Sequence, residues 1–397
     1  IYCFLYFIEQ LMLNYIRSYL RSIKEYIPIR DEITKSFFLT RRKINSKENK
    51  NVNVTETKNQ VEFSDKLIER MKKILSNKIK VSGHWVDMYD IGNKENTFTK
   101  LLAMDNKSFY NELANPHKNN LHYGFGDISH NAINNHRVAD FYIDKTVYDT
   151  VFRICCSLDI EPYPETYHFH NFNYKKLDEM LENIFKKLGK KSNFPNIFIG
   201  EFGLKSKFGI VSFAPIQQMY HAIKVLEFTK TLNKEARVME IGAGLGLSAY
   251  HARNFGIKDY TILDLSLGSL SQSFFFSSTI GEDNIIIGDE VLNYKDTDED
   301  FKNKLKLIPS TSSELVPDNI DLVINCDSIT EMSKEDAISY VNLAAKKSRY
   351  FLSLNHDNNK FKISDIFSNT PFERVYRVPT WYRSGYIEEL YVNTSFN

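Results

Sequence analysis

The sequence predicts an α/β protein in which a mostly helical N-terminal region precedes a largely parallel sheet that is covered by helices on both faces. Beyond about residue 213, short and almost continuously apolar runs alternate with helix-like segments. The last two apolar runs instead face each other across a short turn, which indicates an antiparallel hairpin at the edge of the sheet. Before about residue 190, apolar residues recur three and four positions apart, as in helices.

The composition is that of a folded and nearly neutral protein. The chain has 397 residues, of which 42% are hydrophobic and 25% charged, enough for more than one domain. Lys and Arg number 51 against 50 Asp and Glu, so the formal charge is +1. Because no strong field would attract nucleic acid or an anionic membrane, a small-molecule partner is favoured.

Residues 1–60 predict an amphipathic helix followed by a polar linker. The start, "IYCFLYFIEQLMLNYIRSYLRS", is apolar for eight residues before Glu9, whereas crossing a bilayer takes about 20. We expect this helix to pack on the body or on a partner, with attachment to a membrane surface as the alternative. Residues 41–60, "RRKINSKENKNVNVTETKNQ", indicate a linker. Residue 1 is Ile rather than Met, which leaves an upstream segment open.

The four cysteines predict neither a metal site nor a disulfide framework. They form no CxxC pair and no Cys/His ligand spacing. We therefore expect a reduced, cytoplasmic protein; no ligand set in the sequence demands a metal, and dependence on a divalent cation stays open.

Residues 61–212 predict a helical region, and residues 213–397 the domain that holds the sheet. Helical periodicity runs through "FSDKLIERMKKILSNKI", "RVADFYIDKTVYDTVFRICCSLDI" and "NYKKLDEMLENIFKKLG". In the second domain we expect strands at 237–241, 260–265, 284–288, 320–325 and 349–354, and helices at 214–232, 246–256, 268–279 and 333–348. The hairpin is expected from 372–378 and 386–393.

The segment "ARVMEIGAGLGLSAYHARNFGIKDYTILDLS" predicts a ligand site at the first strand. Gly242, Gly244 and Gly246 lie between strand and helix, where glycine permits a tight turn and close approach of a ligand to the backbone. The alternative is that these glycines only turn the chain. Asp264 ends the next strand, where a carboxylate can bind both ribose hydroxyls, so an adenosine-containing ligand is favoured.

Glu240 favours S-adenosylmethionine over a dinucleotide. A carboxylate before the loop would repel a pyrophosphate but attract the ammonium of a methionine group, and the loop lacks GxGxxG. The expected cofactor-binding residues of the two strand ends are Glu240, Gly242, Ala243, Gly244, Gly246, Asp264 and Leu265.

These motifs resemble those of class I S-adenosylmethionine-dependent methyltransferases. "VMEIGAGLG" is similar to their first motif, "YTILDLS" to the second, "NIIIGDE" to the third and "IDLVINCDSITEM" to the fourth. The resemblance implies a Rossmann-like, seven-stranded sheet with an antiparallel hairpin at its C-terminal edge, and S-adenosylmethionine as cofactor. It places Asp289 near the adenine and adds Asn325 to the cofactor-binding residues.

A narrower resemblance is to bacterial sugar O-methyltransferases associated with surface-polysaccharide synthesis. It is carried by "GEFGLKSKFGIVSFAPIQQMYHA", "INCDSITEMSKEDAISYV", "YFLSLNHD" and "VPTWYRSGYIEELYV". Leu247 departs from that family, where a bulky polar residue often follows the last glycine. The resemblance implies methyl transfer to a hydroxyl of a saccharide, with residues 61–212 covering the substrate.

Three residues after the fourth and fifth strands are candidates for catalysis. Asp327 and Glu331 follow the fourth strand, where a carboxylate could take the proton of a hydroxyl, and His356 follows the fifth. The alternatives are a turn cap, a solvated charge and a surface histidine. The expected substrate-binding residues are Tyr220, His221, Asn355, Trp381 and Arg383.

Other functions stay open on the sequence. Methylation of a base amine usually needs Asn/Asp-Pro-Pro-aromatic, where this chain has Asn325-Cys326-Asp327-Ser328, so no nucleic-acid partner is expected. Another small-molecule acceptor and a catalytically silent binding module are the alternatives, and a nicotinamide dehydrogenase ranks last. The oligomeric state is not predicted.

Overall fold

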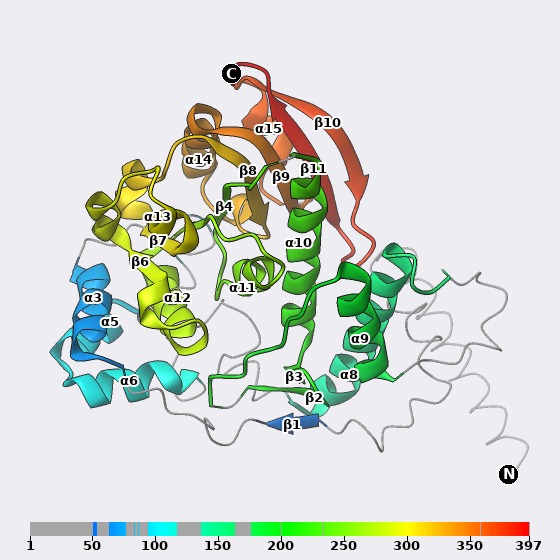
Figure 1. Ribbon diagram of the computed structural model, residues 1–397, viewed down its shortest axis with the longest axis horizontal. Coiled ribbons are helices and arrows are strands. Elements are labelled where there is room, and N and C mark those ends of the chain that lie inside the picture. The colour runs from blue at the N-terminus through cyan, green and yellow to red at the C-terminus, as the bar shows by residue number, and fades with distance from the viewer. Residues whose placement is uncertain are drawn as a thin grey trace, which may run out of the picture.

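The structure is a computed structural model (Figure 1) that describes residues 51–53, 63–76, 83, 86, 94–116, 136–162, 176–199, 201–232, 234–357 and 359–396. The helix expected in the first 22 residues lies outside this range. Across the described residues, no helix combines the length and the apolar character that crossing a bilayer requires.

An eight-stranded sheet forms the centre of the C-terminal half, in the order β10-β11-β9-β8-β4-β5-β7-β6. Its six strands from β4 to β9 pair in parallel, and β11 pairs antiparallel with both β9 and β10. The α/β class and the C-terminal hairpin predicted from the sequence are confirmed. The bounds are β4 Val238–Ile241, β5 Tyr260–Asp264, β6 Ile285–Ile287, β7 Leu305–Pro309, β8 Ile320–Cys326, β9 Ser348–His356, β10 Phe372–Pro379 and β11 Tyr386–Asn393.

The sheet has one strand more than expected. The run at Ile285–Ile287, expected as the third strand, is the outermost strand β6, and β7 lies between it and β5. The sequence pattern missed β7 because Lys306 interrupts its apolar run. Its ammonium is fully buried and is paired with Asp259 at 2.6 Å, so a charged residue fits inside a covered sheet.

Alternate residues of the strands pack on opposite helical layers, as a strand period of two requires. Val238 of β4 belongs to the core under α10, α11 and α12, whereas Met239 and Ile241 belong to the core under α14 and α15. These helices span Phe213–Thr229 (α10), Leu247–Asn254 (α11), Ser266–Thr279 (α12), Lys334–Lys347 (α14) and Ile363–Phe367 (α15). α13 spans Glu299–Asn303, and the 3-10 helices are η3 Lys230–Leu232, η4 Glu282–Asn284, η5 Gly288–Asn293, η6 Ser310–Leu315 and η7 Ile329–Glu331.

The N-terminal region is mostly helical, as expected, and lies against the sheet domain in two groups (Figure 1). α3 packs on α12 and continues into α5 and α6, and α8 packs on α9 and α10. The bounds are α3 Asp65–Ser76, α5 Lys94–Ala103, α6 Asn106–Ala114, α8 His136–Ser157 and α9 Leu177–Leu188.

A small second sheet corrects the linker expected at 41–60. Within that segment Asn51–Asn53 forms β1, which pairs antiparallel with β2 (Phe202–Ser206), and β2 pairs with β3 (Gly209–Val211). These three residues are therefore part of a sheet, although the sequence around them is polar.

Candidate functional site

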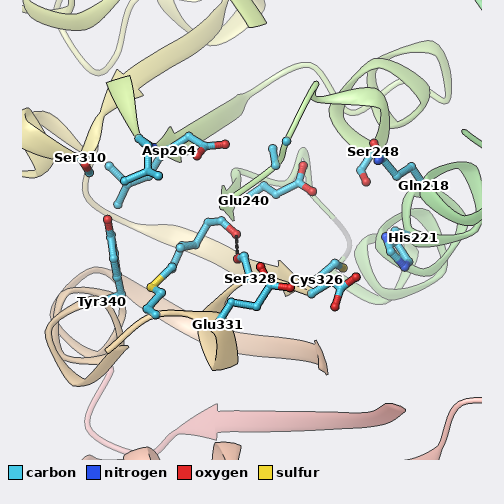
Figure 2. Close-up of a pocket in the computed structure, with 18 of the residues that line it drawn as sticks. Gln218, His221, Glu240, Ser248, Asp264, Ser310, Cys326, Ser328, Glu331 and Tyr340 are labelled. Carbon is cyan, nitrogen blue, oxygen red and sulfur yellow. Dashed lines mark hydrogen bonds between the residues drawn. The ribbon is translucent and has the colours of Figure 1, made fainter. Parts of the chain in front are cut away.

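A cavity of about 550 Å³ lies at the carboxyl ends of β4, β5, β7 and β8. α10 and α14 supply further walls, and Arg383 reaches it from the turn of the hairpin. Figure 2 shows Asp264, Ser310 and Tyr340 at one end, Gln218, His221 and Cys326 at the other, and Glu240 and Glu331 between them. The strand ends thus bring together residues far apart in sequence, at the edge where open α/β sheets bind ligands.

The three loop glycines have different physical reasons to be glycine. All have left-handed φ values, of 69° at Gly242, 60° at Gly244 and 86° at Gly246. A Cβ at Gly242 would overlap the Ser328 hydroxyl, and one at Gly246 would lie 2.7 Å from the Phe276 ring. A Cβ at Gly244 would meet nothing within 4 Å, and Gly244 lines the cavity, so open space for a ligand begins there. Gly246 does not line it.

The Asp264 carboxylate is fixed to the glycine loop by Gln272 of α12. Gln272 Nε2 donates to Asp264 Oδ2 at 2.7 Å and to the Gly244 carbonyl at 2.8 Å, and the backbone N–H of Leu265 donates to Oδ1. Burial raises the pKa of Asp264 to about 6 against the effect of these donors. The carboxylate therefore has a set orientation. Sequence reasoning missed Gln272, which lies in an apolar and serine-rich helix without a motif.

Glu240 is a buried carboxylate in the middle of the cavity wall. Tyr260 Oη donates to its Oε2 at 2.9 Å. Burial raises its pKa to about 7, opposed by hydrogen bonds from Tyr260 and Ser248, while nearby Asp264 raises it further. The charged form of this carboxylate is thus poorly solvated by water, and a cation bound beside it would stabilise that form.

The structure places Asp289 away from the cavity. It follows β6, the outer strand, and its carboxylate pairs with Lys73 of α3 at 2.7 Å on the surface. The loop that occupies the position expected for Asp289 is the one after β7, where Ser310, Thr311 and Ser313 line the cavity. Tyr340 of α14 stands beside them; burial raises its pKa to about 12, opposed by a hydrogen bond with Ser310.

Asn325 and Asn355 are buried in a hydrogen-bond network and line no part of the cavity. Asn325 Nδ2 donates to the Ile241 carbonyl at 2.8 Å and to Ser328 Oγ at 2.6 Å, and Asn355 Nδ2 donates to Asn325 Oδ1 at 2.8 Å. These side chains join β4, β8 and β9 behind the site. Their expected contacts with cofactor and substrate are thus replaced by contacts with the protein.

Asp327 begins the loop after β8 and is held by the hairpin turn. Arg383 Nη1 donates to its Oδ2 and Tyr386 Oη donates to its Oδ1. Its φ of 60° is left-handed, and its N–H donates to the Leu354 carbonyl at 3.0 Å. Asp327 and Arg383 both line the cavity, so the sequence placed two of its candidates together.

Glu331 ends η7 and lines the cavity beside Asp327. Burial raises the pKa of its carboxyl to about 8; the negative charge of Asp327 raises it further and Arg383 opposes this. Within the described part of the chain, no group donates a hydrogen bond to this carboxylate.

Of the remaining predicted site residues, one lines the cavity and three do not. His221 of α10 lines the cavity; its Nε2 is 3.0 Å from Tyr382 Oη, and burial lowers its pKa to about 3. His356 packs edge-on against the Tyr386 ring, with centroids 5.1 Å apart, and is not among the lining residues. Tyr220 accepts a hydrogen bond from Trp381 Nε1 at 3.1 Å, and neither is among the lining residues.

The cavity also holds residues that the sequence did not single out. They include Phe213, Gln218, Ser248, Asp336, Ser339, Tyr340 and Leu343. Helical positions such as Gln218 could have been found as neighbours of His221 one turn away. Among the described residues, no three His, Cys, Asp or Glu side chains lie together as a metal site.

No protein-family model and no curated protein matches the chain. Among solved structures it is similar to the mitomycin 7-O-methyltransferase MmcR (TM-score 0.33, 12% identity, 45% of this chain and 55% of that chain). It is also similar to magnesium protoporphyrin IX methyltransferase from Synechocystis PCC 6803 with bound SAM (TM-score 0.33, 14% identity, 47% and 86%). A third is the glycopeptide N-methyltransferase MtfA (TM-score 0.31, 12% identity, 43% and 90%). Each match covers less than half of this chain.

Proposed function

We propose that this chain is an S-adenosylmethionine-dependent O-methyltransferase acting on a hydroxyl of a sugar or of another saccharide-bearing small molecule. The observation that carries the proposal is a single cavity joining the open space at Gly244, the oriented Asp264 carboxylate and the acidic residues after β8. Its volume lies within the range of about 300–1,000 Å³ of small-molecule sites.

The residues present fit the cofactor. Asp264 would accept hydrogen bonds from the ribose hydroxyls, because each of its oxygens has a lone pair beyond the one used by its protein donor. Glu240, buried in the wall, would attract the ammonium of the methionine group. Ser310 and Tyr340 would flank the adenine. When bound, S-adenosylmethionine supplies an electrophilic methyl group on a positively charged sulfur.

The acceptor would lie at the end formed by α10, the loop after β8 and the hairpin turn. Gln218, His221, Glu331 and Arg383 offer both donors and acceptors there, which suits a polyhydroxylated molecule. The sequence resemblance to sugar O-methyltransferases supports a saccharide and a role in surface-polysaccharide synthesis. The spacing of the four cysteines, which suggests no disulfide framework, supports a reducing, cytoplasmic location.

The N-terminal residues 61–212 are proposed to cover this end of the site. Gly83 supports the proposal because its backbone packs on the backbone of Glu331 and Met332, where a Cβ would overlap.

The test is calorimetric titration of the purified chain with S-adenosylhomocysteine, with NADH as control ligand. We expect micromolar binding of S-adenosylhomocysteine, none of NADH, and loss of binding in Asp264→Ala. Saccharide acceptors are then screened with labelled S-adenosylmethionine. A folded chain that binds neither ligand would indicate a silent module and contradict the proposal.

A further inference from the structure

The two carboxylates after β8 enter the same end of the cavity but differ in what holds them. Both oxygens of Asp327 are engaged, one by Arg383 and one by Tyr386. The Arg383 guanidinium also lies over the Tyr386 ring, 3.9 Å from its centroid. Because each oxygen of Asp327 already accepts from a side chain of the hairpin turn, this carboxylate is committed to contacts within the protein.

Glu331 has a fixed backbone and a carboxylate that accepts no hydrogen bond from the described residues. The Glu331 N–H donates to the Ser328 carbonyl at 3.1 Å, and Gly83 packs against the Glu331 carbonyl. Its side chain lines the cavity, and in the described ranges no donor reaches it. A base needs this combination of a set position and a lone pair available to substrate.

We propose that Glu331 takes the proton of the acceptor hydroxyl, and that Asp327 is a positioning residue that holds the hairpin turn with Arg383 against the cavity. The assignment rests on the proposed function. The acceptor O–H bond breaks and its proton passes to the Glu331 carboxylate. The acceptor oxygen bonds to the methyl carbon as the carbon–sulfur bond breaks, its electron pair remaining on the sulfur, which becomes neutral. The proton later leaves Glu331 to solvent.

The charges around Glu331 agree with this role. Burial first and the Asp327 charge second raise the pKa of Glu331 to about 8, and Arg383 opposes them. A base whose pKa lies near the operating pH both accepts and releases protons readily. The other titratable groups that line the cavity are His221, Glu240, Asp264, Cys326, Asp336 and Tyr340.

The first test measures protons rather than turnover. A positively charged sulfur beside Glu331 would lower its pKa, whereas the neutral sulfur of S-adenosylhomocysteine would not. Calorimetric titrations at about pH 7.5, in two buffers of different ionisation enthalpy, count the protons released with each ligand. We expect S-adenosylmethionine to release on the order of half a proton more than S-adenosylhomocysteine. This difference should vanish in Glu331→Gln and persist in Asp327→Asn.

The matched control is Glu335→Gln, an exposed carboxylate at the start of α14 outside the cavity. It should keep the proton difference of the wild type. Equal differences in wild type and Glu331→Gln would overturn the assignment, as would a difference lost only in Asp327→Asn. Binding of S-adenosylhomocysteine is measured in every variant. A variant that has lost its fold or its cofactor site is therefore recognised by loss of this binding, independently of the proton count. A wild-type chain that binds neither ligand overturns the proposed function, and this assignment with it.

The second test separates base from positioning residue by kinetics with an identified acceptor. Glu331→Gln should lower kcat about 10²- to 10⁴-fold. At saturating S-adenosylmethionine the wild-type rate should rise with pH through a midpoint below 8, because the positively charged sulfur lowers the pKa of Glu331 from its value of about 8 in the free protein. Asp327→Asn should mainly raise KM for the acceptor and keep a pH-dependent rate, with its midpoint moved to lower pH because the Asp327 charge no longer raises the pKa of Glu331. A pH profile that disappears in Asp327→Asn and remains in Glu331→Gln would reverse the two roles.

Discussion

Single residues decide which polar groups at the strand ends face a ligand. Sequence reasoning placed Gly244, Asp264 and Glu331 at one site, because strand ends of a parallel sheet share an edge. It could not distinguish Asn325 and Asn355 from ligand contacts, since a buried asparagine that joins loops and one that binds substrate have the same position in the pattern. It missed Gln272, whose contact with Asp264 depends on packing of α12.

Gly244→Val should abolish binding of S-adenosylhomocysteine, because the new side chain would enter the open space that begins at this residue. The left-handed backbone also adds strain of about 1–2 kcal/mol. Gly189→Val is the matched control: its φ is 63°, its Cβ would also meet nothing within 4 Å, and it caps α9 away from the cavity. Calorimetry and thermal unfolding should show similar destabilisation in both variants but lost binding only at Gly244. Equal binding in both would contradict the expectation.

At the scale of elements, most strands and helices of the second domain could be predicted from the sequence, and the order of strands at the β7–β6 edge of the sheet could not. The strands with continuous apolar runs, such as β5 and β8, stand where the pattern placed them. β7 carries Lys306, whose burial depends on Asp259 at the end of another loop. An ion pair between distant segments leaves no periodic signal, so the sequence pattern misses β7. The pattern then places β6 beside β5, and it predicts Asp289, which lies on the surface, at the site.

The contact of the N-terminal region with η7 depends on Gly83. We expect Gly83→Ala to lower turnover at least tenfold, because its Cβ would overlap the carbonyl of Glu331 and displace that residue. The dissociation constant of S-adenosylhomocysteine should change less than about twofold, since Asp264 and Gly244 lie at the other strands. Gly281→Ala, with φ of 91° and its nearest neighbour 3.6 Å away, controls for backbone strain alone. Unchanged turnover in Gly83→Ala would show that this contact does not position Glu331.

At the scale of the whole molecule, three elements place carboxyl groups with raised pKa values around one cavity, and these groups make the free energy of unfolding depend on pH. Burial raises the pKa of Asp264 to about 6, of Glu240 to about 7 and of Glu331 to about 8. Each value exceeds that of the unfolded chain, so the folded state retains protons that the unfolded chain has lost. The stability they contribute is present below about pH 4 and is lost as pH rises through about 6 to 8.

The free energy of unfolding from urea titrations should therefore fall between about pH 5 and pH 8. In Glu331→Gln the fall should be smaller at the upper end of this range, because glutamine does not titrate. Glu335→Gln, on the surface, should keep the wild-type slope. If the slope of Glu331→Gln equalled that of the wild type, Glu331 would not be protonated in the folded state at neutral pH.

The helix α3 has a consequence for solubility. Ile285–Ile287 is an entirely apolar strand that, among the described residues, pairs with β7 alone, and the open edge of such a strand can recruit strands of other molecules. Arg70 Nη2 donates to the Ile285 carbonyl at 3.0 Å while the same guanidinium pairs with Glu290, so α3 occupies this edge. We therefore expect α3 to limit association of β6 with strands of other molecules. A chain trimmed to the sheet domain would be left with an open β6 and would associate through it.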